Sequence, residues 1–264
     1  MTNDLNTTFT FLNGRTVNRI GYGAMRLTAQ PRNFGPYADW QAGIELLQRA
    51  RDLGIHHIDT ARAYGPHENE KLIAEALLDK EGSYGEMFIA SKGGVEKTAT
   101  SISRDTSAET MKRHLRESLA TLRTNKIDLY YVHAPDGVTL ISESVAALEE
   151  MRQAGKIDMI GLSNVSRSQV EEALRIAPIA AVQNRYSPAD TRDDDLENMI
   201  DWLNDQGIGF VPHGPLGANP MAQGAAVDPG KALRTLLARA PNVLVIPGTT
   251  TIAHLEDNAA AFRA

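Results

Sequence analysis

The feature that most constrains the fold is a regular alternation of short apolar runs with amphipathic segments along all 264 residues. The apolar runs are rich in β-forming residues and are bounded by Gly, Pro or Asp, which predicts strands. The predicted strands are 19–23, 55–59, 87–92, 127–133, 157–163, 179–183, 208–213 and 243–246. Helical spacing of apolar residues between them predicts helices around 44–53 and over 69–78, 108–122, 143–154, 168–176, 193–206, 231–240 and 252–262.

Eight strands alternating with eight helices predict an α/β fold, a (β/α)8 TIM barrel that forms one domain over residues 1–264. A short N-terminal β-hairpin is expected before it, because Phe9 and Phe11 alternate with polar residues ahead of a two-residue Asn13-Gly14 turn. The alternative is a doubly wound open sheet, which usually carries G-x-G-x-x-G after its first strand. The run GYGAMR at 21–26 has only the first two of those glycines, so this fingerprint fails.

Composition narrows the classes of function. The chain has 27 Lys and Arg against 33 Asp and Glu, a formal net charge of −6, and no Cys. A net negative charge does not indicate the basic surface that nucleic acid binding needs. The lack of Cys excludes disulfides, thiolate catalysis and Cys-ligated metals. No apolar run approaches the ~18 residues that a membrane helix needs. We expect a cytoplasmic protein that has neither nucleic acid nor a membrane as its partner.

No metal site is predicted. His56 and His57 are adjacent on a predicted strand, so their side chains point to opposite faces and cannot share an ion without distortion. The run HENE at 67–70 lacks the i, i+4 His pair of a zinc helix. The acidic run at 193–195 precedes a predicted helix and is typical of a helix N-terminus.

Three ionisable residues end consecutive predicted strands, Asp59, Lys92 and His133. In such a barrel the active site lies at the C-terminal ends of the strands, so these groups are aimed into one mouth. Tyr64 follows Asp59 by five residues, a spacing that lets the loop bring its phenol beside Lys92. An adjacent ammonium lowers the pKa of a tyrosine, which suits Tyr64 as a general acid toward a carbonyl oxygen. His133 is then placed to donate a hydrogen bond to that oxygen.

The set Asp59, Tyr64, Lys92 and His133 resembles the four-residue active site of the aldo-keto reductases. The strings HIDTARAYG, FIASKGG, IDLYYVHAPD, IGLSNVS, VQNRYS and IPGTT…HLEDN follow the family order across nearly the whole chain. GYGAMRL and IPGTT are most similar to a bacterial subset that includes pyridoxal reductases. The resemblance implies an NADP(H)-dependent oxidoreductase that reduces aldehydes or ketones to alcohols by hydride transfer from nicotinamide.

The resemblance also implies a set of cofactor-binding residues. Ser163, Asn164 and Gln183 match positions that hold the nicotinamide carboxamide, and the segment from His213 onward matches the one that stacks on the ring and cradles the pyrophosphate. The adenosine 2′-phosphate and adenine are expected near the C-terminus. Arg26 either forms a local salt bridge or binds the cofactor or an anionic substrate, and the sequence leaves these alternatives open. The full set is Gly23, Met25, Arg26, Asp59, Ser163, Asn164, Gln183, His213, Gly214, Pro215, Leu216, Gly217, Pro247, Gly248, Thr249, Thr250, His254, Asp257 and Asn258.

Two departures from the family pattern bear on this site. His213 stands where a large aromatic such as Tyr usually stacks, and Gly248 and His254 stand where Lys and Arg often hold the 2′-phosphate. NADP(H) is therefore expected with NAD(H) as an alternative. The substrate pocket is expected to be open and lined by Tyr22, Arg26, Phe34, Trp40, Tyr64 and His133.

Two other functions stay open at this stage. A barrel isomerase or lyase would use Lys92 as a Schiff base, which needs a lysine of low pKa in an apolar site. A non-catalytic, nicotinamide-binding subunit with a redox-sensing or regulatory role would share the fold and the cofactor. If the protein is a reductase, we expect a small-molecule carbonyl compound as its binding partner and a monomer as its oligomeric state. The physiological substrate and the direction of the reaction are not fixed by the sequence.

Overall fold

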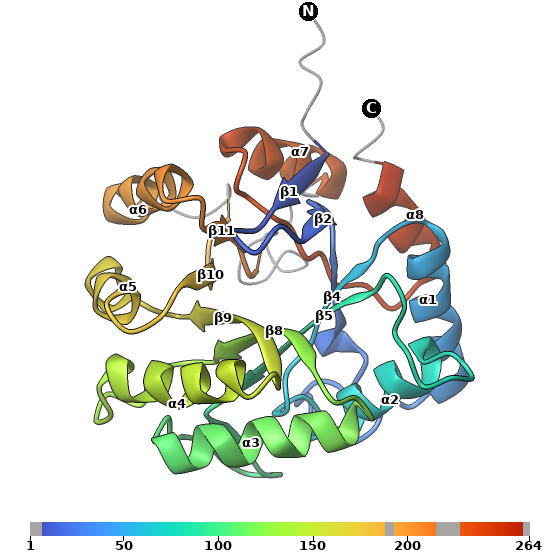
Figure 1. Ribbon diagram of the computed structural model, residues 1–264. Helices are drawn as coiled ribbons and strands as arrows, with labels where there is room; N and C mark the ends of the chain where they lie inside the picture. Colours follow the sequence, from blue (N-terminus) through green and yellow to red (C-terminus); the bar gives the residue numbers. More distant parts are fainter. Residues whose placement is uncertain (1–6, 188–192, 215–227, 261–264) are drawn as a thin grey trace, which may run out of the picture.

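The computed structural model describes residues 7–187, 193–214 and 228–260, and its centre is a curled parallel sheet (Figure 1). The sheet has seven strands in the order β11-β10-β9-β8-β5-β4-β3. Every pairing in it is parallel, because each strand is followed by a helix that returns the chain to the same end of the sheet. The strands are β3 Tyr22–Gly23, β4 His57–Asp59, β5 Phe88–Gly93, β8 Ile127–Val132, β9 Ile157–Ser163, β10 Ile179–Gln183 and β11 Gly209–Phe210.

The predicted strand at 243–246 is reduced to single bridges that join the two edges of this sheet. Val243 forms a parallel bridge with Phe210 in β11, and Val245 forms one with Ile20, just before β3. The backbone N–H of Gly21 donates to the carbonyl of Val245 at 2.8 Å. Pro247 has no N–H to donate to this pairing, although its carbonyl accepts from the backbone N–H of Gly23 at 3.4 Å. The eight predicted positions are thus filled around a ring, but the last is not a regular strand.

Eight α-helices of the described residues surround the sheet and follow one another around it in chain order (Figure 1). They confirm the helical spacing of the sequence, because the described ends after the first helix differ from the predicted ones by no more than two residues. None of these helices is long and apolar enough to cross a membrane. The helices are α1 Trp40–Asp52, α2 Glu68–Leu77, α3 Ala108–Thr121, α4 Ile141–Gln153, α5 Arg167–Leu174, α6 Asp194–Asp205, α7 Pro229–Arg239 and α8 Ile252–Ala260.

The N-terminal hairpin, β1 Thr8–Thr10 with β2 Thr16–Asn18, closes one end of the sheet. Phe11 is buried, and its ring stacks on Phe88 of β5 with centroids 5.4 Å apart. The prediction of a two-residue turn is wrong, because the backbone N–H of Phe11 donates to the carbonyl of Arg15 and three residues lie between them. Gly14 takes φ +84° there, the left-handed conformation that a three-residue hairpin loop requires.

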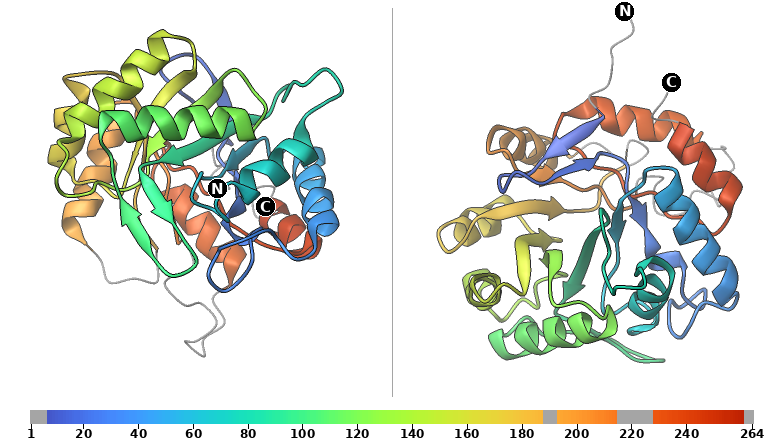
Figure 2. Two further views of the ribbon diagram at one scale, coloured as in Figure 1. Left: turned by 90° about the horizontal axis from the view of Figure 1, so that it is seen from below. Right: turned by 45° about the vertical axis from the view of Figure 1, so that its right-hand side comes forward.

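A second hairpin was not predicted. It joins β6 Val95–Lys97 to β7 Ile102–Arg104 directly after β5. In the left view of Figure 2 it projects, in green, from the same side of the molecule as the blue loop that follows β3. A hydrogen bond of 3.3 Å from Arg32 Nη1 to the carbonyl of Ala99 joins this loop to the hairpin tip. Both segments therefore lie at the end of the sheet where the parallel strands finish.

Arg19 holds the ring closed, which generates a first prediction. It is buried, and its guanidinium donates to the carbonyls of Val243, Leu237 and Ala240 at 2.6–2.9 Å. Arg19→Ala leaves these buried carbonyls without their donor, so we expect a loss of about 3 kcal/mol or more in the free energy of unfolding. Urea denaturation measures it.

The matched control is Arg51→Ala, which removes an exposed arginine paired with Asp52. It should change the free energy of unfolding by less than about 0.5 kcal/mol. Equal effects of the two substitutions would contradict the role of Arg19 in closing the ring.

Candidate active site

A buried ion pair lies at the centre of the site. Asp59 ends β4 and Lys92 lies near the end of β5, the neighbouring strand, and both side chains are almost completely buried. Lys92 Nζ lies 2.5 Å from Asp59 Oδ1 and donates also to the carbonyl of Thr60 at 2.8 Å. Gln183 Nε2 at the end of β10 donates to Asp59 Oδ2 at 2.8 Å. The aspartate is thereby held from two sides of the barrel.

The pair keeps Lys92 charged. Burial alone lowers the pKa of Lys92, but Asp59 and Tyr64 raise it by more, so the pKa lies above its ordinary value. A lysine that forms a Schiff base needs the opposite shift, since only the neutral amine attacks a carbonyl. The environment of Lys92 therefore suits a fixed cation and does not favour the lyase interpretation.

Tyr64 lies on the loop between β4 and α2, and the structure brings it next to Lys92. Lys92 Nζ is 5.2 Å from the centroid of the Tyr64 ring. Burial raises the pKa of Tyr64, and the lowering by Lys92 does not overcome it. The expected influence of the ammonium is present, but the net direction is upward, so the phenol keeps its proton at neutral pH. A protonated phenol is the form that a general acid requires.

His133 follows the end of β8, and its ring meets Tyr64 edge to face, with centroids 5.9 Å apart. Burial and the charge of Lys92 lower the pKa of His133 to about 3. The imidazole is therefore neutral at physiological pH and carries one N–H donor. The four residues predicted as catalytic thus lie together at one end of the sheet.

The polar residues at the ends of β9 and β10 form a connected group beside this centre. Asn164, at φ +57°, donates through its amide to Ser163 Oγ and to the carbonyl of His133, both at 3.0 Å. Asn164 Oδ1 lies 3.0 Å from His213 Nε2. Burial lowers the pKa of His213 to about 4, so this ring is also neutral. Of the segment predicted to follow, Gly214 is exposed, and Pro215, Leu216 and Gly217 lie outside the described residues.

The C-terminal segment packs against the first strand with little space between the two backbones. A Cβ atom on Gly23 would lie 2.6 Å from the carbonyl oxygen of Ile246, and one on Gly248 would lie 2.7 Å from that of Gly23. The buried Tyr22 donates from its hydroxyl to the carbonyl of Thr249 at 2.6 Å. Tyr22 was expected to line the substrate pocket, but here its hydroxyl supports the loop before α8.

The residues expected near the adenosine lie in the loop before α8 and in the first turns of α8. Thr250, His254 and Asp257 are exposed, whereas Thr249 and Asn258 are buried. Thr249 Oγ1 accepts from the backbone N–H of Thr251, so its side chain shapes the loop. Glu256, next to Asp257 in α8, is bound by Arg49 of α1 at 2.6 Å.

Of the remaining predicted residues, one lies near Tyr64, one faces the helices and two are exposed. Phe34 forms a backbone bridge with Gly65, directly after Tyr64, and so lies near the loop that carries Tyr64. Trp40 begins α1 and donates from Nε1 to Glu75 of α2 at 3.0 Å, so its polar edge faces the helical layer. Met25 and Arg26 are exposed on the short helix after β3.

Two buried residues that sequence reasoning missed position the loop that carries Tyr64. The side chain of Asn69 accepts from Thr60 Oγ1 and donates to the carbonyls of Ala24 and Leu27 at 2.8–2.9 Å. Arg62, two residues before Tyr64, forms ion pairs with Glu96 and Glu117. Neither has a local sequence signal, because their partners come from distant segments.

Glu70 is a third buried group missed from the sequence. Ser91 Oγ, adjacent to Lys92 in the chain, donates to Glu70 Oε1 at 2.6 Å, whereas Oε2 has no hydrogen-bond partner among the described residues. Burial raises the pKa of Glu70 to about 7.

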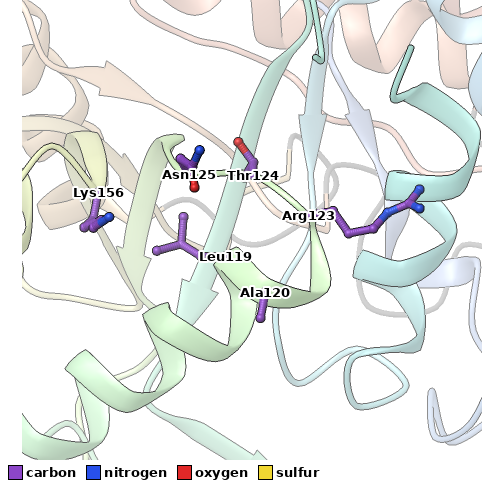
Figure 3. Close-up of a pocket in the computed structure, with 6 residues that line it drawn as sticks. All are labelled: Leu119, Ala120, Arg123, Thr124, Asn125 and Lys156. Atoms are coloured by element: carbon purple, nitrogen blue, oxygen red, sulfur yellow. The ribbon is translucent and has the colours of Figure 1, made fainter. Parts of the chain in front are cut away.

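A separate cavity of about 380 Å³ lies at the other end of the sheet, near the starts of β8 and β9 (Figure 3). Its two cationic side chains diverge, and Arg123 points toward α2, where it donates to the carbonyl of Ala74. The cavity is therefore separate from the group of Asp59, Tyr64, Lys92 and His133. It is lined by Leu119, Ala120, Arg123, Thr124, Asn125 and Lys156.

Comparison with known proteins gives consistent matches. The model of the Aldo/keto reductase family matches residues 19–235. Pyridoxine 4-dehydrogenase of Escherichia coli is 38% identical over 273 residues, which cover 96% of this chain and 92% of that protein. A Schizosaccharomyces pombe aldo-keto reductase with NADP(+) in its name is 30% identical over 292 residues, 94% of this chain and 84% of that one. An aldo/keto reductase of Klebsiella pneumoniae, solved with NADP and acetate, has a TM-score of 0.78 at 23% identity, covering 98% of this chain and 90% of that one.

The raised pKa of Glu70 predicts a pH-dependent stability. In the unfolded chain a glutamate loses its proton near pH 4.5, whereas the folded protein keeps it up to about pH 7. The stability of the natural protein therefore falls as the pH rises through this window. Glu70→Gln removes the buried ionisation and should add about 2–3 kcal/mol at pH 8 relative to pH 5, measured by urea denaturation. The exposed-site control Glu81→Gln should show no such difference. The same pH dependence in both variants would refute the assignment.

Proposed function

This chain belongs to the Aldo/keto reductase family, and on this premise we propose that it reduces aldehydes or ketones to alcohols with NADP(H). The observation that carries the proposal is the buried Asp59–Lys92 pair beside Tyr64 and a neutral His133. A fixed cation, a protonated phenol and a neutral imidazole at one point suit the protonation of a carbonyl oxygen.

The residues at the strand ends fit a nicotinamide. Ser163, Asn164 and Gln183 offer a hydroxyl and two amides at the ends of adjacent strands, a donor and acceptor set that matches a carboxamide. The glycine contact between Gly23 and Gly248 leaves no room for a side chain where the loop reaches α8. The N-terminus of α8 offers backbone N–H groups and a favourable dipole to a phosphate. When bound, the nicotinamide supplies a hydride to the carbonyl carbon.

In the proposed mechanism Tyr64 transfers its proton to the carbonyl oxygen as negative charge develops there. Lys92 stabilises the phenolate that remains, and Asp59 keeps Lys92 charged and in place. His133 donates a hydrogen bond to the same oxygen and orients the substrate. The reverse reaction uses the Tyr64 phenolate as the base. Pyridoxal is a reasonable first substrate to assay, because a relative of this chain is named pyridoxine 4-dehydrogenase.

A direct test titrates the purified protein with NADPH and with NADH in parallel. Quenching of the fluorescence of Trp40 and Trp202 reports cofactor binding, and oxidation of the nicotinamide with pyridoxal or 4-nitrobenzaldehyde reports turnover. Binding with turnover supports the reductase. Tight binding without turnover on any reactive aldehyde favours the regulatory subunit, and trapping of a lysine adduct by borohydride favours the lyase.

Tyr64→Phe is expected to lower kcat for reduction about a thousandfold, because the proton donor is lost. The affinity for NADPH should stay close to that of the natural protein. Since the pKa of Tyr64 is raised and His133 is neutral above about pH 3, kcat should be constant between about pH 6 and pH 9 and fall only at higher pH. Steady-state kinetics over this range check both statements. Near-normal activity of Tyr64→Phe would remove Tyr64 from the role of acid.

His254→Arg should improve the affinity for NADPH over NADH about tenfold, because a fixed cation then faces the 2′-phosphate. His254 is exposed in the first turn of α8, and the nearby Glu256 is already paired with Arg49. Fluorescence titration with both cofactors gives the ratio. Ala253→Arg adds the same charge one residue earlier. An equal gain in the NADPH-to-NADH affinity ratio there would mean that the added charge acts through the overall electrostatic potential and not through a contact at position 254.

A further inference from the structure

The hairpin β6–β7 presents two cations on one face. Val95 is paired with Arg104, and Lys97 with Ile102. Because directly paired residues and alternate residues of a strand share a face, all four side chains lie on the same side of the hairpin. Glu96 lies on the other face, where it binds Arg62, Arg113 and His114.

This face borders the catalytic residues. Val95 is buried in a small apolar cluster with Ala63 and Ala134. These two alanines are the chain neighbours of Tyr64 and His133, so the cluster seats the hairpin against the catalytic loops. The charge of Arg104 also contributes to the low pKa of His133.

Neither cation has an ion pair among the described residues, and the nearest carboxylates along the chain have other partners. Asp105 accepts hydrogen bonds from Ser107 and Thr110 at the start of α3. Asp136 accepts from the backbone N–H groups of Thr106, Val138 and Thr139. Arg104 is exposed and Lys97 is partly buried, and burial lowers the pKa of Lys97. In a chain of net charge −6, these two cations share one face of a hairpin that lies beside the site.

We propose that Arg104 and Lys97 form an anion subsite at the mouth of the active site, which selects carbonyl substrates bearing a negatively charged group. The proposal rests on the reductase function proposed above. Ile102, 65% exposed and paired with Lys97, offers an apolar contact to the body of such a substrate. Arginine binds carboxylate and phosphate oxygens through two parallel N–H groups, and the lysine adds a second charge.

The test compares 4-carboxybenzaldehyde with its neutral methyl ester, which differ in charge but carry the same aldehyde. For the natural protein kcat/KM should favour the acid, and added salt should reduce this preference because the subsite is partly open to solvent. Arg104→Gln should lower the acid-to-ester ratio about tenfold, and Lys97→Gln by a smaller factor. Arg104→Lys should restore part of the ratio, and Arg104→Glu should reverse the preference. 4-Formylphenyl phosphate replaces the acid in a parallel arm that separates phosphate from carboxylate recognition.

Arg116→Gln is the matched control, because it removes the same charge from the exposed surface of α3 and should leave the ratio unchanged. If Arg104→Gln reduces the ester but keeps the natural acid-to-ester ratio, the subsite is refuted and the reductase stands. If the natural protein reduces none of the aldehydes, the reductase function fails and the subsite falls with it. An equal loss of the ratio in Arg116→Gln would show a general field effect and would also refute the subsite.

Discussion

The ion pair between Asp59 and Lys92 is the interaction on which the rest of the site depends. Two opposite charges taken out of water cost several kcal/mol each unless further hydrogen bonds satisfy them. Thr60 supplies one bond to the lysine, and Gln183 supplies one to the aspartate from the far side of the barrel. The pair therefore ties β4, β5 and β10 together at the end where the chemistry is proposed. It also fixes the charge that neighbours Tyr64.

The electrostatic character of the site follows from burial around this one fixed cation. Burial lowers the pKa of His133 and that of His213, and the charge of Lys92 lowers both further, so both imidazoles stay neutral. Tyr64 lies beside the same ammonium yet keeps its proton, because burial disfavours the phenolate more than the ammonium favours it. The site thus holds donors that are protonated without being charged. Such donors suit an oxygen that becomes negative only during the reaction.

The sequence predicts the parts of the fold that depend on local periodicity and misses those that depend on distant partners. The helices and most strands were placed, and Asp59, Lys92 and His133 were expected at the mouth because they end consecutive strands. The hairpin β6–β7 was missed, since its short polar strands have no clear alternation. Glu70 gave no signal either, because its burial depends on packing against Ser91 in another element. The predicted length of the turn at Gly14 was wrong for a related reason, because the pairing of the strands, and not the Asn-Gly dipeptide, sets that length.

The two faces of the hairpin β6–β7 show how one short element serves the site twice. Its Glu96 face binds Arg62, and Arg62 lies on the loop that carries Tyr64, so this face fixes the position of the proposed acid. Its Val95 face packs on Ala63 and leaves Arg104 without a counterion beside the mouth. Because alternate residues point to opposite faces, a shift of one residue in either strand would exchange these roles. The register of the hairpin therefore links the placement of the acid to the charge that a substrate meets on entry.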